Sequence, residues 1–253
     1  MRIAVLADVH GNLPALEAVL SHLEKQGGCD QTWVLGDLAV FGPYPRQVLE
    51  RLAALPNKRF VQGNTDRYLA TGRRPPQPLV EDESQWSRMI SLLEERDANF
   101  RWTVGLLDYK WYSFLSELPF EQRLDVPSYG AIVGVHGSPV SDEVGIWAEI
   151  TDSDLREMLS GMECRLLVCG HTHRPLDRSL NQARVINVGS VGLPLDGDRR
   201  AAYGTLDLEG GECEVGLHRV EYDVDGVIDK LTEMGHPAID WVGSRLRLAA
   251  SPK

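Results

Sequence analysis

Several features that mark exported, membrane-spanning or zinc-ribbon proteins are missing from this sequence. The four cysteines form no CxxC pair and no closely spaced framework of the kind that builds a small disulfide-stabilised domain. The apolar run near the start covers only residues 3–7, which is too short for a signal peptide or a membrane span. We therefore expect a cytoplasmic protein with reduced thiols.

A block of lysine or arginine residues is also missing. The formal net charge is −11, and a negative field of this kind repels nucleic acid backbones and anionic membranes. Bound divalent metals can dominate the local potential, so the charge does not exclude an enzyme that acts on phosphate. We expect a small phosphate-ester or nucleotide substrate as partner, with no stable nucleic acid complex and no membrane association.

Short apolar runs alternate with segments of helical periodicity along the chain. Runs rich in Val, Ile and Leu predict buried strands, and apolar residues three and four positions apart predict helices. The strands are expected at 1–7, 33–35, 59–61, 131–135, 166–169, 184–187, 202–208 and 213–221, and the helices from Pro14, across 45–55 and near 152–160 and 225–235. This order predicts a layered α/β protein, in which ligands gather at the carboxyl ends of strands.

The domain organisation follows from length and composition. A chain of 253 residues with 43 % hydrophobic residues can bury one core, and no change in composition marks a linker. We expect a single domain over residues 1–253. Residues 71–83 are rich in proline and polar side chains, and helices are expected near 84–98 and 108–117. The stretch near 71–118 is therefore interpreted as a helical insertion or cap.

Polar side chains with metal-binding potential follow five of the apolar runs. Each one alone is explained as a turn residue, a helix cap or an ordinary histidine. Together they are not, because four of the seven histidines fall at these strand ends. The five groups are Asp8-Val9-His10, Gly36-Asp37, Gly63-Asn64, His136 and His171-Thr172-His173.

The spacing within these groups favours a common pocket. Asp8 and His10 are two residues apart, as are His171 and His173. An extended backbone would point both side chains of each pair in the same direction. Gly36, Gly63 and Gly170 immediately precede predicted ligands, and glycine permits close or strained backbone approach.

The donor set combines imidazole, carboxylate and amide groups without thiolate. Such a set suits manganese, iron, zinc or nickel, and manganese is our first expectation. Seven protein ligands exceed the needs of one ion, so two divalent metal ions that share a carboxylate are predicted. Two ions about 3.5–4 Å apart can clamp a phosphate and acidify a bridging water to hydroxide.

In this order, the motifs DxH, GD, GNxD, a later lone histidine and GHTH resemble the calcineurin-like metallophosphoesterase superfamily, in particular its YfcE-like phosphodiesterase branch. The resemblance implies a four-layer αββα sandwich of two facing mixed sheets. It implies one metal held by Asp8, His10, Asp37 and His173, and a second held by Asp37, Asn64, His136 and His171. It also implies that Asp37, Asn64 and His136 are the catalytic residues.

The sequence departs from many members of the family at one position. Those members carry a histidine directly after the asparagine, where this chain has Thr65. Threonine is no general acid near neutral pH, and losing such help costs about 10²–10⁴-fold when the leaving group needs a proton. The departure favours phosphoanhydrides and activated phosphodiesters, including nucleotide-type substrates, over alkyl monoesters such as phosphoserine.

Three residues outside the metal-binding set are candidates for substrate binding, as is Asn64 within it. Asn12 either contacts substrate or caps its helix, and Arg199 and Arg200 either clamp a phosphate or lie in a solvated turn. Two alternative functions remain open at this point. One is a serine/threonine-type protein phosphatase, and the other is a non-catalytic interaction scaffold on the same fold, which would be expected to lose some ligands.

Overall fold

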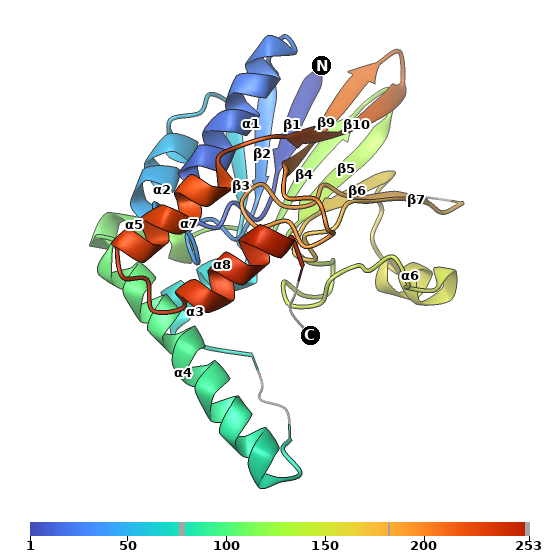
Figure 1. Ribbon diagram of the computed structural model, residues 1–253. Coiled ribbons are helices and arrows are strands. Elements are labelled where there is room, and N and C mark those ends of the chain that lie inside the picture. The colour runs from blue at the N-terminus through green and yellow to red at the C-terminus, as the bar shows by residue number, and fades with distance from the viewer. Residues whose placement is uncertain (76–78, 182, 251–253) are drawn as a thin grey trace.

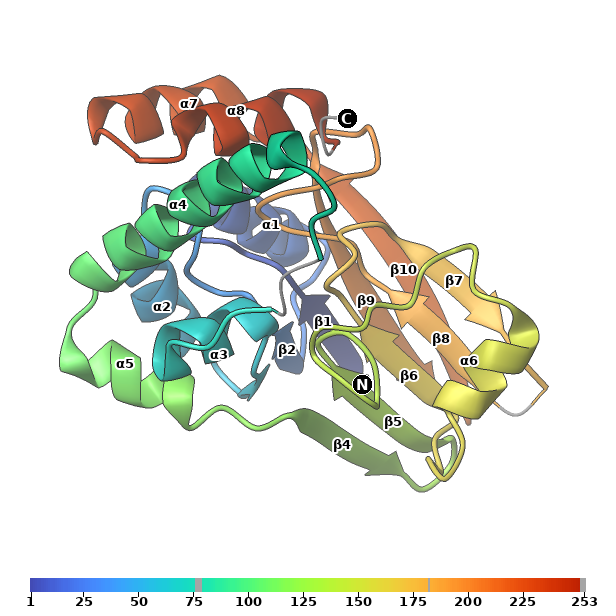
Figure 2. The same ribbon diagram turned by 90° about the horizontal axis from the view of Figure 1, so that it is seen from below.

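The computed structural model describes residues 1–75, 79–181 and 183–250. Two five-stranded sheets face each other, with helices outside them (Figures 1 and 2). The strands are β1 (Arg2–Leu6), β2 (Gln31–Leu35), β3 (Lys58–Val61), β4 (Glu121–Val126), β5 (Gly130–Val135), β6 (Leu166–Cys169), β7 (Leu176–Ser179), β8 (Arg184–Asn187), β9 (Ala201–Glu209) and β10 (Glu212–Val220). The helices are α1 (Leu13–Lys25), α2 (Pro45–Ala53), α3 (Asn64–Thr71), α4 (Glu83–Gly105), α5 (Tyr109–Ser116), α6 (Asp152–Met158), α7 (Val224–Glu233) and α8 (Ile239–Leu248).

Both sheets are mixed. The first has the order β10-β9-β1-β2-β3. Strands β1, β2 and β3 are parallel to one another, β9 is antiparallel to β1, and β10 is antiparallel to β9. The second has the order β4-β5-β6-β8-β7, in which β5, β6 and β8 are parallel and the two edge strands are antiparallel. Each sheet therefore contains three neighbouring parallel strands, and the carboxyl ends of these strands meet at one edge.

The buried side chains form layers that match this arrangement. Alternate residues of β1 point to opposite faces: Ile3 and Val5 pack between the sheets against Ile132 and Val168, whereas Ala4 and Leu6 pack beneath α1 and α2. On the far side of the second sheet, Leu155 of α6 closes a smaller core with the outer face of β5, β6 and β8. The predicted four-layer αββα sandwich is confirmed.

The predicted helices and strands are largely confirmed, and four elements went unpredicted. These are α3, β4, β7 and α8. The proline-rich stretch 71–83 includes residues 76–78, which lie outside the described residues. The predicted helix at 84–98 is longer than expected: α4 continues to Gly105 and projects from the body of the molecule (Figure 1).

The helices do not resemble membrane spans. Within the described ranges, none is long and apolar enough to cross a bilayer.

Candidate metal centre

The seven predicted metal ligands converge at the edge where the parallel strands of both sheets end. Asp8 and His10 follow β1, Asp37 follows β2, and Asn64 is the first residue of α3 after β3. From the second sheet, His136 follows β5, and His171 and His173 follow β6. We call this set the seven-residue cluster: Asp8, His10, Asp37, Asn64, His136, His171 and His173.

The backbone beneath the cluster is not extended, which corrects one expectation. Asp8, His10, Asp37, His171 and His173 all have positive φ, between 51° and 67°. They are five of the eight non-glycine residues with positive φ in the described part of the chain. Side chains two residues apart therefore converge through a left-handed turn rather than through strand alternation, and strain of this kind concentrates at functional sites.

Two glycines permit the close contacts on which this turn geometry depends. A Cβ atom on Gly63 would lie 2.2 Å from Asp37 Oδ1, and one on Gly170 would lie 2.5 Å from Asp8 Oδ2. Either distance is too short for a real side chain. The prediction that glycine precedes the ligands for reasons of close approach is confirmed at both positions.

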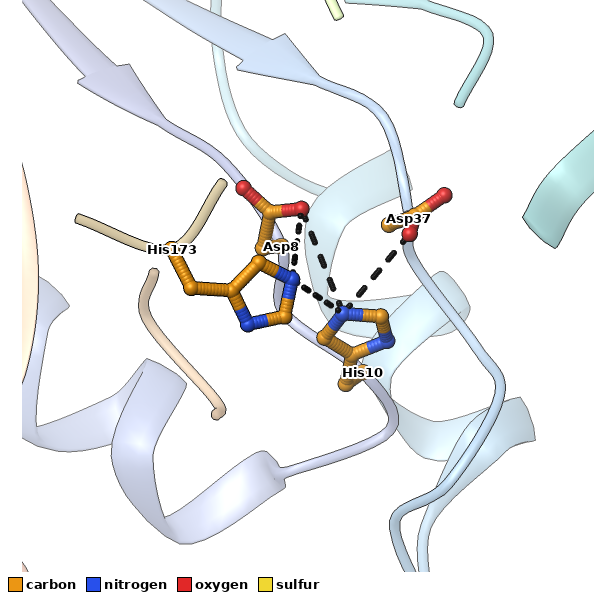
Figure 3. A group of neighbouring side chains, drawn as sticks. All are labelled: Asp8, His10, Asp37 and His173. Carbon is orange, nitrogen blue, oxygen red and sulfur yellow. Dashed lines mark hydrogen bonds and ion pairs between the residues drawn. The ribbon is translucent and has the colours of Figure 1, made fainter. Parts of the chain in front are cut away.

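The first half of the cluster consists of four buried side chains. One ligand atom from each of Asp8, His10, Asp37 and His173 lies within 4.8 Å of those of the other three (Figure 3). His173 Nε2 lies 3.2 Å from Asp8 Oδ1, and His10 Nε2 lies 3.7 Å from Asp37 Oδ2. Asp8 Oδ1 is buried and has no hydrogen-bond partner among the described residues. An unpaired buried carboxylate oxygen calls for a cation.

In the first half of the cluster, the neutral tautomers of His10 and His173 leave their Nε2 lone pairs facing each other. His10 Nδ1 donates to the Val40 carbonyl at 3.2 Å, and His173 Nδ1 donates to the Leu193 carbonyl. A carbonyl only accepts, so Nδ1 carries the proton in each neutral ring and Nε2 is then an acceptor. The two Nε2 atoms are 3.2 Å apart, and with both rings neutral neither can donate to the other. A cation between them resolves this repulsion, and backbone carbonyls are common partners of metal-binding histidines.

The second half of the cluster shows the same conflict among three acceptors. His136 Nδ1 donates to the Leu35 carbonyl at 2.7 Å, and His171 Nε2 donates to the Glu143 carbonyl at 3.1 Å. Their other ring nitrogens lie 3.2 Å apart, and each lies 3.0 Å from Asn64 Oδ1. Three lone-pair atoms thus face a common point.

Asp37 lies between the two halves. Its Oδ2 faces His10, and its Oδ1 lies 3.5 Å from His136 Nε2. Oδ1 also accepts a hydrogen bond from the Thr65 backbone N–H at 2.9 Å.

The pKa shifts reflect burial and nearby carboxylates. Burial lowers the pKa of His10 to about 4, and burial together with His136 lowers that of His171, so both favour the neutral form that binds metal. Burial also opposes charge on His136 and His173, but Asp37 and Asp8 respectively outweigh it and raise the pKa of each. The negative potential that stabilises a proton on His136 and His173 also stabilises a metal cation beside them.

Asp66 contributes to the centre without facing it. Its buried carboxylate accepts hydrogen bonds from the backbone N–H groups of Asp37, Leu38 and Gly63 at 2.8, 3.0 and 3.0 Å. Burial and the Asp37 carboxylate raise the pKa of Asp66 to about 7. The GNxD motif gives no signal for this role, although an acidic residue three positions into a helix is a known capping pattern.

The three further substrate-binding candidates lie outside the cluster. Asn12 is buried: its Oδ1 caps α1 by accepting from Ala15 N–H at 3.2 Å, and its Nδ2 donates to the Gly192 carbonyl at 2.9 Å. Arg199 and Arg200 lie on an exposed turn beside Tyr222, and Arg200 pairs with Asp198 at 2.6 Å. Contact of these three residues with substrate stays a prediction.

Among the known proteins that resemble this chain are enzymes that act on phosphate esters or anhydrides. The profile of the calcineurin-like phosphoesterase superfamily domain matches residues 1–211. A solved metallophosphoesterase from Sphaerobacter thermophilus is 28 % identical, with 99 % of each chain covered and a TM-score of 0.75. The phosphodiesterase YfcE of Escherichia coli is 27 % identical over 82 % of this chain and 88 % of its own. A symmetrical bis(5'-nucleosyl)-tetraphosphatase of Erwinia tasmaniensis is 36 % identical over 26 % of this chain and 24 % of its own.

Proposed function

Because the chain belongs to the calcineurin-like phosphoesterase superfamily, and is thus a metal-dependent phosphoesterase, we propose that it hydrolyses phosphodiester or phosphoanhydride bonds of nucleotide-type substrates at two divalent metal ions. We propose manganese as the native metal, with iron, zinc or nickel as alternatives. The observation that carries the proposal is the set of opposed acceptor atoms in the seven-residue cluster. With the four rings neutral, five ring or amide atoms face one another without a proton between them.

The assignment of ligands follows from which acceptors face one another. Asp8, His10, Asp37 and His173 would hold one ion, and Asp37, Asn64, His136 and His171 would hold the other. Asp37 would bridge, because its two oxygens face histidines of different halves. When bound, such ions polarise a phosphoryl oxygen and acidify water.

The chain's own groups then orient the substrate. Asn64 directs Oδ1 at the two histidines, which leaves its Nδ2 hydrogens for a phosphoryl oxygen. The Nδ1–H bonds of His10, His136 and His173 to backbone carbonyls fix the ring orientations, so the cluster needs little rearrangement before it binds charge.

Thr65 supports a preference for good leaving groups. It occupies the position after Asn64 and is 5 % exposed. Because a threonine hydroxyl does not protonate an alkoxide near neutral pH, substrates whose leaving group is a stable anion are favoured. Phosphoanhydrides and aryl or nucleotidyl diesters have such leaving groups. The tetraphosphatase named among the relatives cleaves a substrate of this class, which agrees with the proposal.

The test is metal content and turnover of the purified chain. Protein stripped with a chelator and reloaded with Mn²⁺ should bind two ions and hydrolyse bis-p-nitrophenyl phosphate and diadenosine tetraphosphate. Asp37→Asn removes the bridging charge and should reduce both activities to background. Asp154→Asn, on the exposed face of α6, is the matched control and should retain metal and turnover.

Two results would contradict the proposal. Fully metal-loaded protein that hydrolyses neither substrate would contradict the proposed substrate class. A phosphoserine peptide that is turned over as fast as the diester would show that the leaving-group argument from Thr65 is wrong.

A further inference from the structure

A cavity of about 580 Å³ lies beside the seven-residue cluster, between α3, α4 and α8. Its aromatic walls come from Phe41, Tyr68, Phe100 and Trp241. Asn64 belongs both to the cavity lining and to the cluster, so the two are contiguous. The volume falls within the range of small-molecule sites, roughly 300–1,000 Å³. A group attached to a phosphate at the cluster could therefore extend into this cavity.

Four buried polar atoms of the lining residues have no hydrogen-bond partner among the described residues: Thr65 Oγ1, Tyr68 Oη, Arg96 Nε and Asn99 Oδ1. Asn99 on α4 is 1 % exposed and Thr65 on α3 is 5 % exposed. Buried donors and acceptors that stay unpaired destabilise the fold, so their presence around a largely apolar cavity points to a ligand that supplies both donors and acceptors.

Phe41 joins the cavity to the cluster. Its φ is 87°, a strained conformation for a phenylalanine. Held there, its ring lies 5.0 Å from the His10 ring on one side and 5.0 Å from the Trp241 ring on the other. The aromatic wall therefore begins at the candidate metal site and continues into the cavity.

We propose that this cavity binds the base of the nucleotide substrate, and that the base is adenine. The inference rests on the proposed function, because it assigns the organic part of that substrate. A carboxamide pairs with adenine through an adjacent amino donor and ring-nitrogen acceptor, which would satisfy Asn99. The aromatic side chains would contact the faces and edges of the ring. An acyl chain would fill the same space but leave Asn99 Oδ1 unpaired.

The role of α4 follows from this assignment. Residues from Gln85 to Phe100 line one side of the cavity, and they come from the stretch near 71–118 that the sequence marked as an insertion. This helix would thus select the substrate, while the cluster carries out the hydrolysis.

Three p-nitrophenyl phosphodiesters that share one leaving group test the proposal: the adenosine-5' ester, the methyl ester and the octyl ester. On Mn²⁺-loaded protein, kcat/KM for the adenosine ester should exceed that for the other two. Asn99→Leu should reduce the ratio of adenosine to methyl ester by about tenfold or more, the size expected for a lost bidentate pair. Glu94→Leu, on an exposed position of the same helix, is the matched control and should leave the ratio unchanged.

Adenosine binding to metal-free protein gives a readout that is independent of catalysis. Titration calorimetry should show binding of adenosine but not of ribose, and Asn99→Leu should abolish it. The Tm of Asn99→Leu should equal or exceed that of the wild type, because an unpaired buried carboxamide has been removed; a structural role would lower it. Asn99→Ser, with a smaller side chain, should show the same loss of adenosine binding and guards against misfolding of the leucine variant.

The outcomes separate this inference from the proposed function. An octyl ester preferred over the adenosine ester, or equal rates on adenosine and methyl esters without adenosine binding, overturns the base assignment and leaves the phosphodiesterase proposal intact. Three inert esters together with Asn99-dependent adenosine binding would support the base site and contradict the proposed hydrolysis.

Discussion

At the scale of single residues, Asp66 shows how much the centre depends on a side chain that does not face it. Its carboxylate holds the backbone after β2 and the backbone before α3 in one hydrogen-bonded unit. Asp37 and Asn64 project from these two segments. The positions of two predicted ligands thus depend on a third, fully buried residue.

Asp66→Ala should lower the free energy of unfolding by about 3 kcal/mol or more, because three buried N–H groups lose their acceptor and each costs about 1–3 kcal/mol. Urea denaturation of the metal-free protein measures the change. Asp108→Ala removes a capping bond to the Trp111 N–H at the start of α5 and should cost only about 1 kcal/mol. Equal losses in the two variants would contradict the role given to Asp66.

At the scale of elements, α3 links the two sheets across the centre. Arg67 on α3 donates to Asp142 at 2.6 and 2.9 Å and to Glu143 at 2.5 Å. Both acidic residues lie on the segment after β5, and the Glu143 carbonyl receives the Nε2–H of His171. A helix that follows the first sheet therefore positions a histidine that follows the second.

Arg67→Met should weaken Mn²⁺ binding by about 10–100-fold, the usual range for loss of a group that orients a metal ligand. The measurement is the Mn²⁺ concentration that gives half-maximal hydrolysis of bis-p-nitrophenyl phosphate. Arg46→Met breaks an exposed pair with Glu50 on α2 and should leave that concentration unchanged. An unaltered Mn²⁺ requirement in Arg67→Met would show that the link does not matter for the centre.

Most helices and strands could be predicted from the sequence, because buried strands and amphipathic helices leave a periodic pattern of apolar residues. The missed elements lack that pattern. The edge strands β4 and β7 alternate exposed and half-buried residues along largely polar sequences. Helix α3 begins at Asn64 itself. Its first residue therefore belongs to the Gly63-Asn64 motif, which was interpreted as the end of a strand.

The convergence of the seven residues of the cluster could be predicted because their side chains carry a recognisable chemistry. The groups that orient them could not, since the carbonyls of Leu35, Val40, Glu143 and Leu193 are backbone atoms with no sequence signature. The positive φ values were missed for a related reason: nothing in an Asp-Val-His or His-Thr-His triplet reports that tertiary contacts hold it in a left-handed turn.

At the scale of the whole molecule, one histidine far from the predicted ligands links stability to pH. His236 follows α7 and is 2 % exposed. Its Nδ1 accepts from the Ala238 N–H at 3.2 Å, and its ring packs edge-on against Trp102 with centroids 4.6 Å apart. Burial lowers the pKa of His236 to about 4, whereas an unfolded histidine titrates near 6.5.

Between about pH 6.5 and pH 4 the unfolded chain therefore binds a proton that the folded chain does not. Stability should fall as the pH decreases through this window, and His236 should contribute roughly 2 kcal/mol of that loss. His236→Asn keeps an acceptor in place of Nδ1 but does not titrate, so its urea midpoint should fall less over the same range. A constant difference between wild type and variant from pH 7 to pH 4.5 would contradict this assignment.

The distribution of the cluster along the chain has a consequence for biosynthesis. Its members extend from Asp8 to His173, and each sheet supplies part of the set. A chain that emerges from the ribosome with only the first three strands holds Asp8, His10, Asp37 and Asn64 but lacks every histidine of the second sheet. The seven-residue cluster cannot be completed until the segment after β6 has left the exit tunnel, so the proposed metal ions would bind only at a late stage of synthesis.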